Sequence, residues 1–415
     1  ATLGIGIAEG SGFIHTLLRK LMSYIPRAAL TPAVVIVSIL CHVASDSVYV
    51  ILMPLAALMF YCAGRHPLAG VACSFAGLSG GFTASYTPSV IDPVMQSFTQ
   101  AAAQTLDASY SVNVLCNYFF ALGGTFFVIA ACWYVTDKIV EPRLWATMPL
   151  DKGLENDPDL RITPVSALEN SAYRKACTVF LGLAALLFVL CWPEGSMLRA
   201  PDGSLTSPKA PVMQAIVPLI FIFFSLPGIV YGYAAGTFKS SSDVIKSMEE
   251  VMKMLLGFMV FAFFAAQFLY VFGKSGIGTL LKALGMPSAG SLLGIIIFTG
   301  MLNLLITSAT SKWAILSTIF VPMLMMLGIS PELTQAAFRV SDSAVNVCTP
   351  MFPFYPLLIM YCQKYCKQAG VGTLSSMMIP YTLALLVALT FVLYAFWGIG
   401  IPIGFDSGYV YPPVK

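Results

Sequence analysis

The sequence repeats one arrangement of apolar and polar segments in its two halves. Residues 11–21 are closely similar to residues 275–284. Each copy is followed by a long apolar stretch with a short polar break, then by a proline (Pro67 or Pro331), and then by a second apolar segment whose break ends in Thr-Pro. Interrupted apolar segments at corresponding positions of two halves are typical of the binding sites of secondary transporters.

The composition sets the broad class of protein. Hydrophobic residues make up 58% of the chain and charged residues 10%, whereas an average soluble domain has about 25% charged residues. Several apolar runs reach the ~20 residues that a helix needs to cross a bilayer. We therefore predict an all-α polytopic membrane protein, and the net charge of +3 gives no support for a nucleic-acid partner.

Uninterrupted apolar spans are expected to cross the membrane as single helices. They are residues 113–137, 173–192, 211–234, 254–273 and 376–400. Residues 1–18 are expected to be the end of a further helix. Because its apolar part is only about half the ~20 residues of a crossing, we expect the protein to begin earlier. With the two broken helices below, this gives about eight transmembrane helices.

Two apolar stretches carry a polar break near the middle. Residues 28–64 and 288–328 are each long enough for two short helices, but neither half spans ~30 Å at 1.5 Å per residue. We predict re-entrant hairpins, since irregular backbone at membrane depth must be buried in protein or line a water-filled cavity. Residues 67–97 and 332–364 are predicted to be broken helices.

The loop charges predict the orientation. If the helix of residues 1–18 ends in the cytoplasm, most Lys and Arg residues lie on the cytoplasmic side. The first hairpin then enters from the cytoplasm and the second from outside, so the two copies are inverted. The expected units are a first repeat, a cytoplasmic linker with scaffold helices, a second repeat and a periplasmic tail: residues 1–137, 138–253, 254–400 and 401–415.

Four ionisable residues stand out near membrane depth: Asp46, Asp92, Arg339 and Asp342. The loop charges also leave Lys312 at membrane depth. Each of these residues costs about 2.5–3.5 kcal/mol on insertion scales, so such residues are rare and usually functional. The structural alternative for Asp46 and Asp92 is a helix cap. For Arg339 and Asp342, which are three residues apart on one helical face, the alternative is a structural salt bridge.

The breaks are rich in small and polar residues that suit an ion site. Unwound carbonyls and hydroxyls offer oxygens to a small cation, and free helix N-termini favour an anionic carboxylate. The alternative is helix packing through small residues. Trp313 is a candidate for stacking on an aromatic ligand, or alternatively an interface anchor. The residues concerned are Gly80 and Gly81 in the break of the first broken helix, Thr310 and Ser311 in the hairpin break predicted at residues 307–311, Asn303 one turn before that break, and Asn346 in the break of the second broken helix.

Two other functional classes are considered. Residues 77–80 match the GxSG pattern of intramembrane serine proteases, with Ser79 as nucleophile. That reaction needs a base within hydrogen-bond reach, and the inverted repeat has no role in it, so we expect no enzyme. An ion channel is the other alternative, and it predicts passive flux that does not saturate.

Three segments carry a resemblance to a known family. Residues 311–315, 336–343 and 43–47, with residues 91–93 as a weaker fourth, resemble the AbgT family of p-aminobenzoyl-glutamate transporters and antimetabolite exporters. The likeness covers essentially the whole chain, but the family's first helix and part of its second have no counterpart here.

The resemblance implies an architecture, a function and a set of residues. It implies a homodimer in the bacterial inner membrane, with nine helices and two hairpins per subunit. It also implies transport of p-aminobenzoyl-glutamate or export of sulfonamide-type antimetabolites, coupled to Na⁺ or H⁺, with no cofactor. The positions that match functional residues of the family are Asp92, Asn303, Trp313, Pro331, Arg339, Asp342 and Pro350.

These expectations combine into one hypothesis of alternating access. Arg339 or a helix N-terminus holds the anionic end of an aromatic carboxylate or sulfonamide, and Trp313 holds its ring. Asp342 binds the coupling cation with Asn303 and carbonyls of the breaks. Asp92 is the alternative carrier if the coupling ion is a proton, and the direction of transport stays open.

Overall fold

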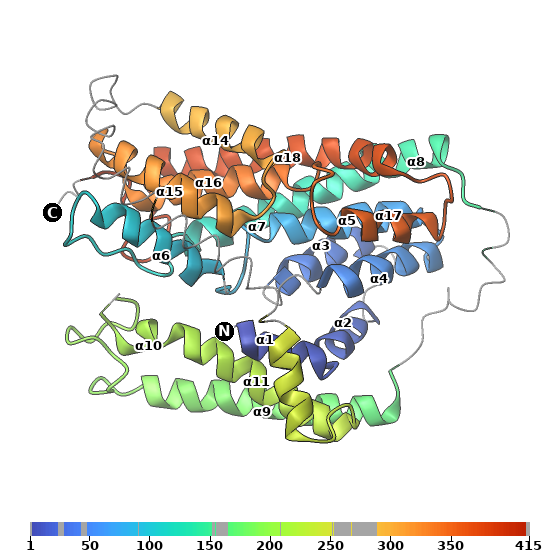
Figure 1. Ribbon diagram of the computed structural model, residues 1–415, viewed down its shortest axis with the longest axis horizontal. Helices are drawn as coiled ribbons and strands as arrows, with labels where there is room; N and C mark the ends of the chain where they lie inside the picture. Colours follow the sequence, from blue (N-terminus) through green and yellow to red (C-terminus); the bar gives the residue numbers. More distant parts are fainter. Residues whose placement is uncertain are drawn as a thin grey trace.

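The computed structural model describes residues 2–23, 29–42, 48–89, 91–151, 165–207, 209–250 and 289–411, with the single residues 154, 252 and 267. Within these residues the regular structure is helical, and β-pairing is limited to one isolated bridge between Ile329 and Val410. Figure 1 shows two layers of helices, a smaller one with α1, α2, α9, α10 and α11 and a larger one with the others. The all-α prediction is confirmed.

The smaller layer differs in detail from the sequence prediction. It contains α1 (Thr2–Gly10), α2 (Phe13–Ser23), α9 (Ala167–Cys191), α10 (Pro211–Gln214) and α11 (Ile216–Ala235). The predicted single helix over 1–18 is wrong, because Gly12 has φ of 85° between α1 and α2, a left-handed conformation that glycine adopts easily. α9 begins before residue 173 because Ser166 and Glu169 form a capping box.

The larger layer has the same element order in each half. The first half contains α3 (Leu30–Cys41), α4 (Val48–Cys62), α5 (Pro67–Gly80), α6 (Ile91–Gln104) and α7 (Tyr118–Val135). α7 continues through the π-helical turn η3 (Thr136–Val140) into α8 (Glu141–Thr147). The second half contains α14 (Ala289–Asn303), α15 (Ala309–Met326), α16 (Pro331–Val345), α17 (Tyr355–Gln363) and α18 (Val371–Ile399).

This order agrees with two hairpins and two broken helices. The paired short helices are α3 with α4 and α14 with α15, and the broken helices are α5 with α6 and α16 with α17. Five helices in the described part of the chain are long and apolar enough to cross a membrane. The first hairpin tip, with Asp46, and nearly all of the span predicted at 254–273 lie outside the described residues.

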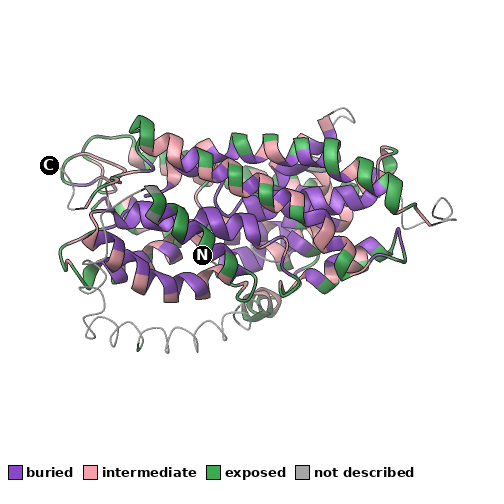
Figure 2. Cartoon of the chain, turned by 90° about the horizontal axis from the view of Figure 1, so that it is seen from above, coloured by how far each residue is buried: buried purple, intermediate pink, exposed green. Residues whose placement is uncertain are grey.

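The hairpins place α5 and α16 at the centre of the larger layer. The helices α3 and α4 pack against α5, and α14 and α15 pack against α16. Each hairpin also reaches the other half, because α15 packs on α6 and α4 packs on α17. Every residue of α5 and of α16 is buried, as the purple helices inside Figure 2 illustrate.

Both central helices begin in the same way. Pro67 and Pro331 occupy the first turns of α5 and α16, where proline lacks only an N–H that would have no helical partner. The cap of α16 is Ser330, whose hydroxyl accepts from the Leu333 N–H and donates to the Gly408 carbonyl at 2.6 Å. The segment after α18 therefore fixes the start of α16.

Close backbone approach also positions α5. A Cβ added at Gly70 of α5 would lie 2.6 Å from the carbonyl oxygen of Ala56 in α4. Glycine at this position lets the hairpin helix pack directly on the central helix.

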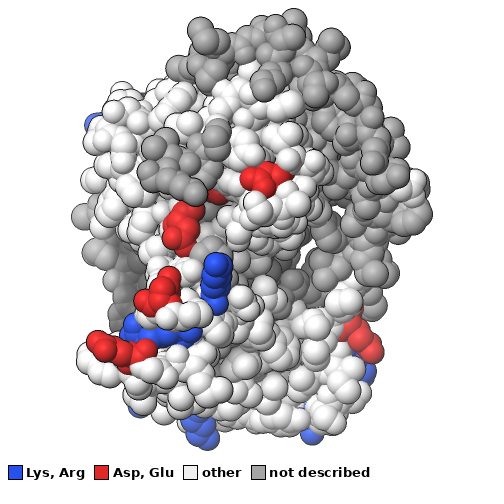
Figure 3. Space-filling view, turned by 90° about the vertical axis from the view of Figure 1, so that its left-hand side faces the viewer, with Lys and Arg blue, Asp and Glu red and all other residues white. Residues whose placement is uncertain are grey.

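Charged groups of both signs lie at the two ends of the molecule. Figure 3 shows the end at the left of Figure 1, where the visible charged side chains are few and of both signs. At the other end, where α8 lies, Arg65 forms ion pairs with Asp137 and Glu141. Under the predicted orientation, that end faces the cytoplasm.

Candidate functional site

The helix α16 carries the site because it buries charged and polar side chains along its whole length. A buried charge is costly unless it is paired or hydrogen-bonded. The residues that pair or hydrogen-bond with these side chains therefore show which other elements α16 connects. The buried polar and charged residues of α16 are Glu332, Thr334, Gln335, Arg339, Ser341, Asp342 and Ser343.

Arg339 joins the two halves of the chain. Its Nη1 lies 2.6 Å from Oδ1 of Asp92, which is in the first turn of α6. Its Nη2 donates to the carbonyl of Phe82, in the break after α5. The helix-cap alternative for Asp92 agrees with the structure, because its Oδ2 also accepts from the Ser89 N–H at 2.7 Å and so closes the turn before α6.

Asp342 is paired with a lysine from the second hairpin. Nζ of Lys312, in the first turn of α15, forms an ion pair with Oδ1 of Asp342, and each side chain is only 1% exposed. The predicted alternative of a salt bridge between Arg339 and Asp342 is therefore wrong, since each residue pairs with a different helix. The sequence places Lys312 at membrane depth but does not predict its pairing with Asp342, because spacing along the chain does not show which residues of α15 face α16.

The two asparagines that contact Asp342 have amide oxygens without partners among the described residues. Asn303, at the end of α14, donates its amide to the Asp342 carbonyl at 3.0 Å, and Asn346 donates to Asp342 Oδ2 at 3.0 Å. The amide oxygens of both asparagines are buried and accept no hydrogen bond from any described residue. The hydroxyls of Thr299 and Ser341 are also buried without a partner within the described ranges. Hard oxygens of this kind are the ligands that small cations prefer.

A small cavity lies beside the Arg339–Asp92 pair. It is lined by these two residues and by Ser85, Thr87 and Asn117, among others. The Asn117 side chain is 3% exposed, and neither its oxygen nor its nitrogen has a partner in the described structure. The room inside is about 10 Å³, close to what a single water requires. The site is closed to a larger solute in this conformation.

Trp313 is part of the packed interior. The indole is fully buried, donates its N–H to Thr99 Oγ1 at 3.0 Å, and packs on Phe338 with ring centroids 4.6 Å apart. The interface-anchor alternative is wrong because the ring does not reach the surface. Contact with a ligand requires the tip of the second hairpin to separate from α6, which carries Thr99.

The central helices touch at equivalent positions of the repeat. The Ser79 hydroxyl of α5 donates to the Ser343 carbonyl of α16 at 2.8 Å, and the two serines are 264 residues apart. Pro67 and Pro331, which start the two helices, have the same separation. The hydroxyls of Thr83 and Ser343 are 2.5 Å apart at the same crossing. The axis that relates the two halves therefore passes close to this contact.

The predicted glycines of the first break serve close packing. A Cβ at Gly80 would lie 2.7 Å from Val128 Cγ1, and one at Gly81 would lie 3.0 Å from His42 Cβ. This observation agrees with the packing alternative for these two positions.

The other break residues lie near the second hairpin tip. The break runs through residues 304–308, so Thr310 and Ser311 are in the first turn of α15, where Ser308 caps the helix. The Thr349 hydroxyl donates to the Leu304 carbonyl at 3.0 Å and joins this break to the break in α16. Pro350, the next residue, is exposed, whereas Pro331 is buried at the opposite end of α16.

Glu332 and Asn117 are further buried groups that the sequence does not mark. Glu332 is 1% exposed and accepts from the Tyr110 hydroxyl at 3.0 Å.

Among the described residues, no group of three or more His, Cys, Asp or Glu side chains is suited to a metal ion. A cation at Asp342 would therefore be held mainly by neutral oxygens.

Together these features define a polytopic membrane transporter with two hairpins around two broken helices. The model of the AbgT putative transporter family matches residues 1–411, and the chain belongs to this family. The predicted resemblance is confirmed, and the protein is a transporter of the bacterial inner membrane. The protease alternative is wrong, because the family and its characterised relatives are transporters and not enzymes.

Three relatives show how far the similarity extends. The chain is 32% identical over 412 residues to the p-aminobenzoyl-glutamate transport protein of Escherichia coli (strain K12). The aligned region covers 97% of this chain and 79% of the relative. The YdaH transporter of Alcanivorax borkumensis matches with a TM-score of 0.88 and 36% identity, over 97% of this chain and 85% of that one. MtrF of Neisseria gonorrhoeae, described within a class of antimetabolite efflux pumps, matches with a TM-score of 0.87 and 38% sequence identity. The match covers 100% of this chain and 82% of the MtrF chain.

Proposed function

We propose that this protein is a cation-coupled transporter that moves aromatic carboxylates like p-aminobenzoyl-glutamate, or exports sulfonamide-type antimetabolites, by alternating access. The main supporting observation is the buried polar helix α16, in which Arg339 and Asp342 form ion pairs with two different elements, α6 and α15. Such pairs can exchange partners when the elements move. The names of two relatives support the substrate class, since one is a p-aminobenzoyl-glutamate transport protein and the other an antimetabolite efflux pump.

The substrate anion is assigned to the cavity beside Arg339. A guanidinium binds carboxylates through parallel hydrogen bonds, and the unpartnered Asn117 amide lies in the same lining. Because the room is only about 10 Å³, the substrate enters when α6, which carries Asp92, moves away from α16 and from the second hairpin. That movement also frees Trp313, which then stacks on the aromatic ring.

The coupling cation is assigned to Asp342 with the amide oxygens of Asn303 and Asn346. In the closed conformation, Lys312 supplies the positive charge that Asp342 needs. A sodium ion replaces Lys312 at the carboxylate when the hairpin withdraws, so ion binding and hairpin movement are linked. Proton coupling through Asp92 is the alternative arrangement, because Asp92 loses Arg339 when the substrate takes the guanidinium.

Transport in proteoliposomes tests the proposal. Counterflow of labelled p-aminobenzoyl-glutamate and of a sulfonamide is measured with sodium and pH gradients imposed separately. Saturable counterflow driven by one gradient supports coupling and identifies the ion. Flux that does not saturate and ignores both gradients would instead indicate the channel alternative.

The oligomeric state is tested separately. We propose a homodimer, which the family resemblance implies. Light scattering of the purified protein, corrected for bound detergent, gives the mass of the protein component. A mass of one chain would contradict the dimer without bearing on the transport site.

A further inference from the structure

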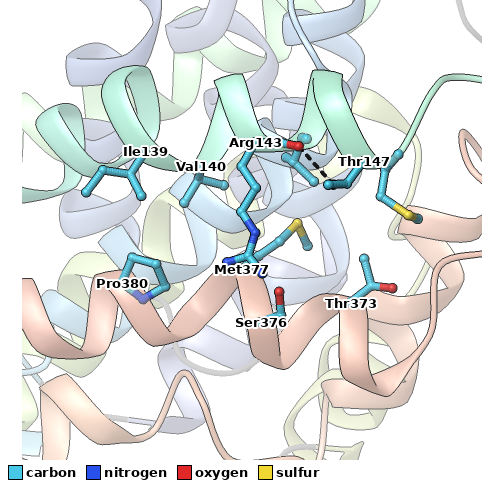
Figure 4. Close-up of a pocket in the computed structure, with 10 residues that line it drawn as sticks. Ile139, Val140, Arg143, Thr147, Thr373, Ser376, Met377 and Pro380 are labelled. Atoms are coloured by element: carbon cyan, nitrogen blue, oxygen red, sulfur yellow. Dashed lines mark hydrogen bonds between the residues drawn. The ribbon is translucent and has the colours of Figure 1, made fainter.

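A second cavity, which shares no lining residue with α16, lies between η3 with α8 on one side and the start of α18 on the other. Its volume is about 200 Å³, and its lining includes Ile139, Arg143, Thr147, Thr373, Ser376 and Pro380. Figure 4 shows the Arg143 side chain extending from α8 across this space towards Met377 and Ser376 of α18.

The polar side of the cavity suits an anion. The Arg143 guanidinium makes no hydrogen bond or ion pair with any residue in the described ranges, and only its carbonyl is engaged, by the Thr147 hydroxyl at 2.8 Å. The nearest acidic residue on α8, Glu141, is paired with Arg65. Thr373 and Ser376 belong to the first two turns of α18, where the helix dipole favours negative charge.

The apolar side continues as a strip along α18. Ile379, Leu383 and Val387 follow at intervals of four residues and are 51%, 59% and 70% exposed. The same strip reaches Phe391, whose ring lies 5.8 Å from that of Phe127 in α7. A membrane helix presents such side chains to lipid chains, so a ligand of this cavity can lay a long apolar tail on the strip.

We infer that this cavity binds an anionic phospholipid of the cytoplasmic leaflet. The phosphate lies at Arg143 with the hydroxyls of Thr373 and Ser376, and an acyl chain follows Pro380 along α18. Under the predicted orientation, α8 and the start of α18 are at the cytoplasmic surface, where basic pockets between helices bind anionic headgroups. A free phosphate would use the polar side alone and leave the apolar strip unoccupied.

Lipid binding to the purified full-length chain tests this inference. Delipidated protein in a mild detergent is titrated with phosphatidylglycerol, with phosphatidylcholine of the same acyl chains, or with inorganic phosphate. Native mass spectrometry counts bound lipid, and the melting temperature reports stabilisation. We expect saturable binding of phosphatidylglycerol, and weaker effects of the other two probes.

Matched arginine variants locate the site. Arg143→Ala is expected to weaken phosphatidylglycerol binding about fivefold, the factor that corresponds to about 1 kcal/mol for one basic residue near anionic lipid. Arg174→Ala is the control, because Arg174 is also exposed on a helix and its carbonyl likewise accepts from a threonine four residues later. Ser376→Phe, which keeps Arg143 and fills the cavity, should also weaken binding.

Two results would overturn the inference. One is unchanged phosphatidylglycerol binding by both Arg143→Ala and Ser376→Phe. The other is stabilisation by inorganic phosphate equal to that by phosphatidylglycerol, which would assign the cavity to a soluble anion.

Discussion

Lys312 and Asp342 form an ion pair between α15 and α16 in which each side chain is only 1% exposed. The pair connects the first turn of α15, the second helix of the second hairpin, to the last turns of the central helix α16. Because no other described charge pairs with either group, removing one partner leaves the other buried and unpaired.

Asp342→Ala is expected to abolish transport and to lower the free energy of unfolding by about 3–5 kcal/mol, the usual cost of breaking a buried pair. The double variant Lys312→Met with Asp342→Leu should recover most of the stability, since it leaves no buried charge. Transport should stay absent in the double variant. Melting temperature and counterflow are measured on both, and transport by either one would remove Asp342 from the ion site.

Arg339→Lys is expected to reduce the rate of substrate counterflow at low substrate concentration by a factor of about 10 to 150. Lysine keeps the positive charge beside Asp92. Its ammonium group lacks the planar set of N–H donors with which a guanidinium binds the Phe82 carbonyl and a substrate carboxylate at the same time. The loss corresponds to one hydrogen bond to a charged group, worth about 1.5–3 kcal/mol. Arg199→Lys is the control, because Arg199 binds only carbonyls in a loop outside the site. Equal rates for the two variants would contradict the assignment.

A disulfide between positions 83 and 343 is expected to stop transport. The hydroxyls of Thr83 and Ser343 are 2.5 Å apart, so cysteines at both positions lie within bonding reach. Oxidation of the double-cysteine variant should reduce counterflow to background, and a reductant should restore it. The single-cysteine variants, oxidised in parallel, control for the native cysteines. Full transport by the cross-linked protein would mean that the break after α5 does not have to move away from α16 during transport.

Gly70→Ala is expected to lower the free energy of unfolding by about 1–3 kcal/mol, because the new methyl group would overlap the Ala56 carbonyl of α4. Gly182→Ala in α9 is the matched control, since a Cβ there meets nothing within 4 Å. That control should gain about 0.5–1 kcal/mol from the preference of helices for alanine. Thermal unfolding in detergent gives both values, and equal shifts would show that the approach of α4 to α5 is not tight.

The sequence predicts the order of the elements better than it predicts their partners. Pro67 and Pro331 mark the starts of the two central helices, since proline is favoured at the first turn and rare inside a helix. The polar breaks were placed to within a few residues because serine, threonine and glycine interrupt long apolar runs. The break of the second hairpin lies at residues 304–308 and not at the predicted 307–311, and its end is set by Ser308, which caps α15 by a local hydrogen bond.

The pairing of buried charges is a tertiary property. Arg339 and Asp342 are close along one helix, and local spacing alone favours a bond between them. The fold instead brings Asp92 and Lys312 to them from α6 and α15. The sequence does not mark Asn117 as a site residue, because an asparagine directly before an apolar helix is an ordinary helix N-cap.

The bond between Ser330 and Gly408, 78 residues later, has a consequence for biogenesis. During translation, the first turn of α16 stays without this support until the segment after α18 has left the ribosome and crossed the bilayer. A fusion or deletion that disturbs residues 408–411 should therefore impair maturation of the central helix, even though it lies far from the coupling residues.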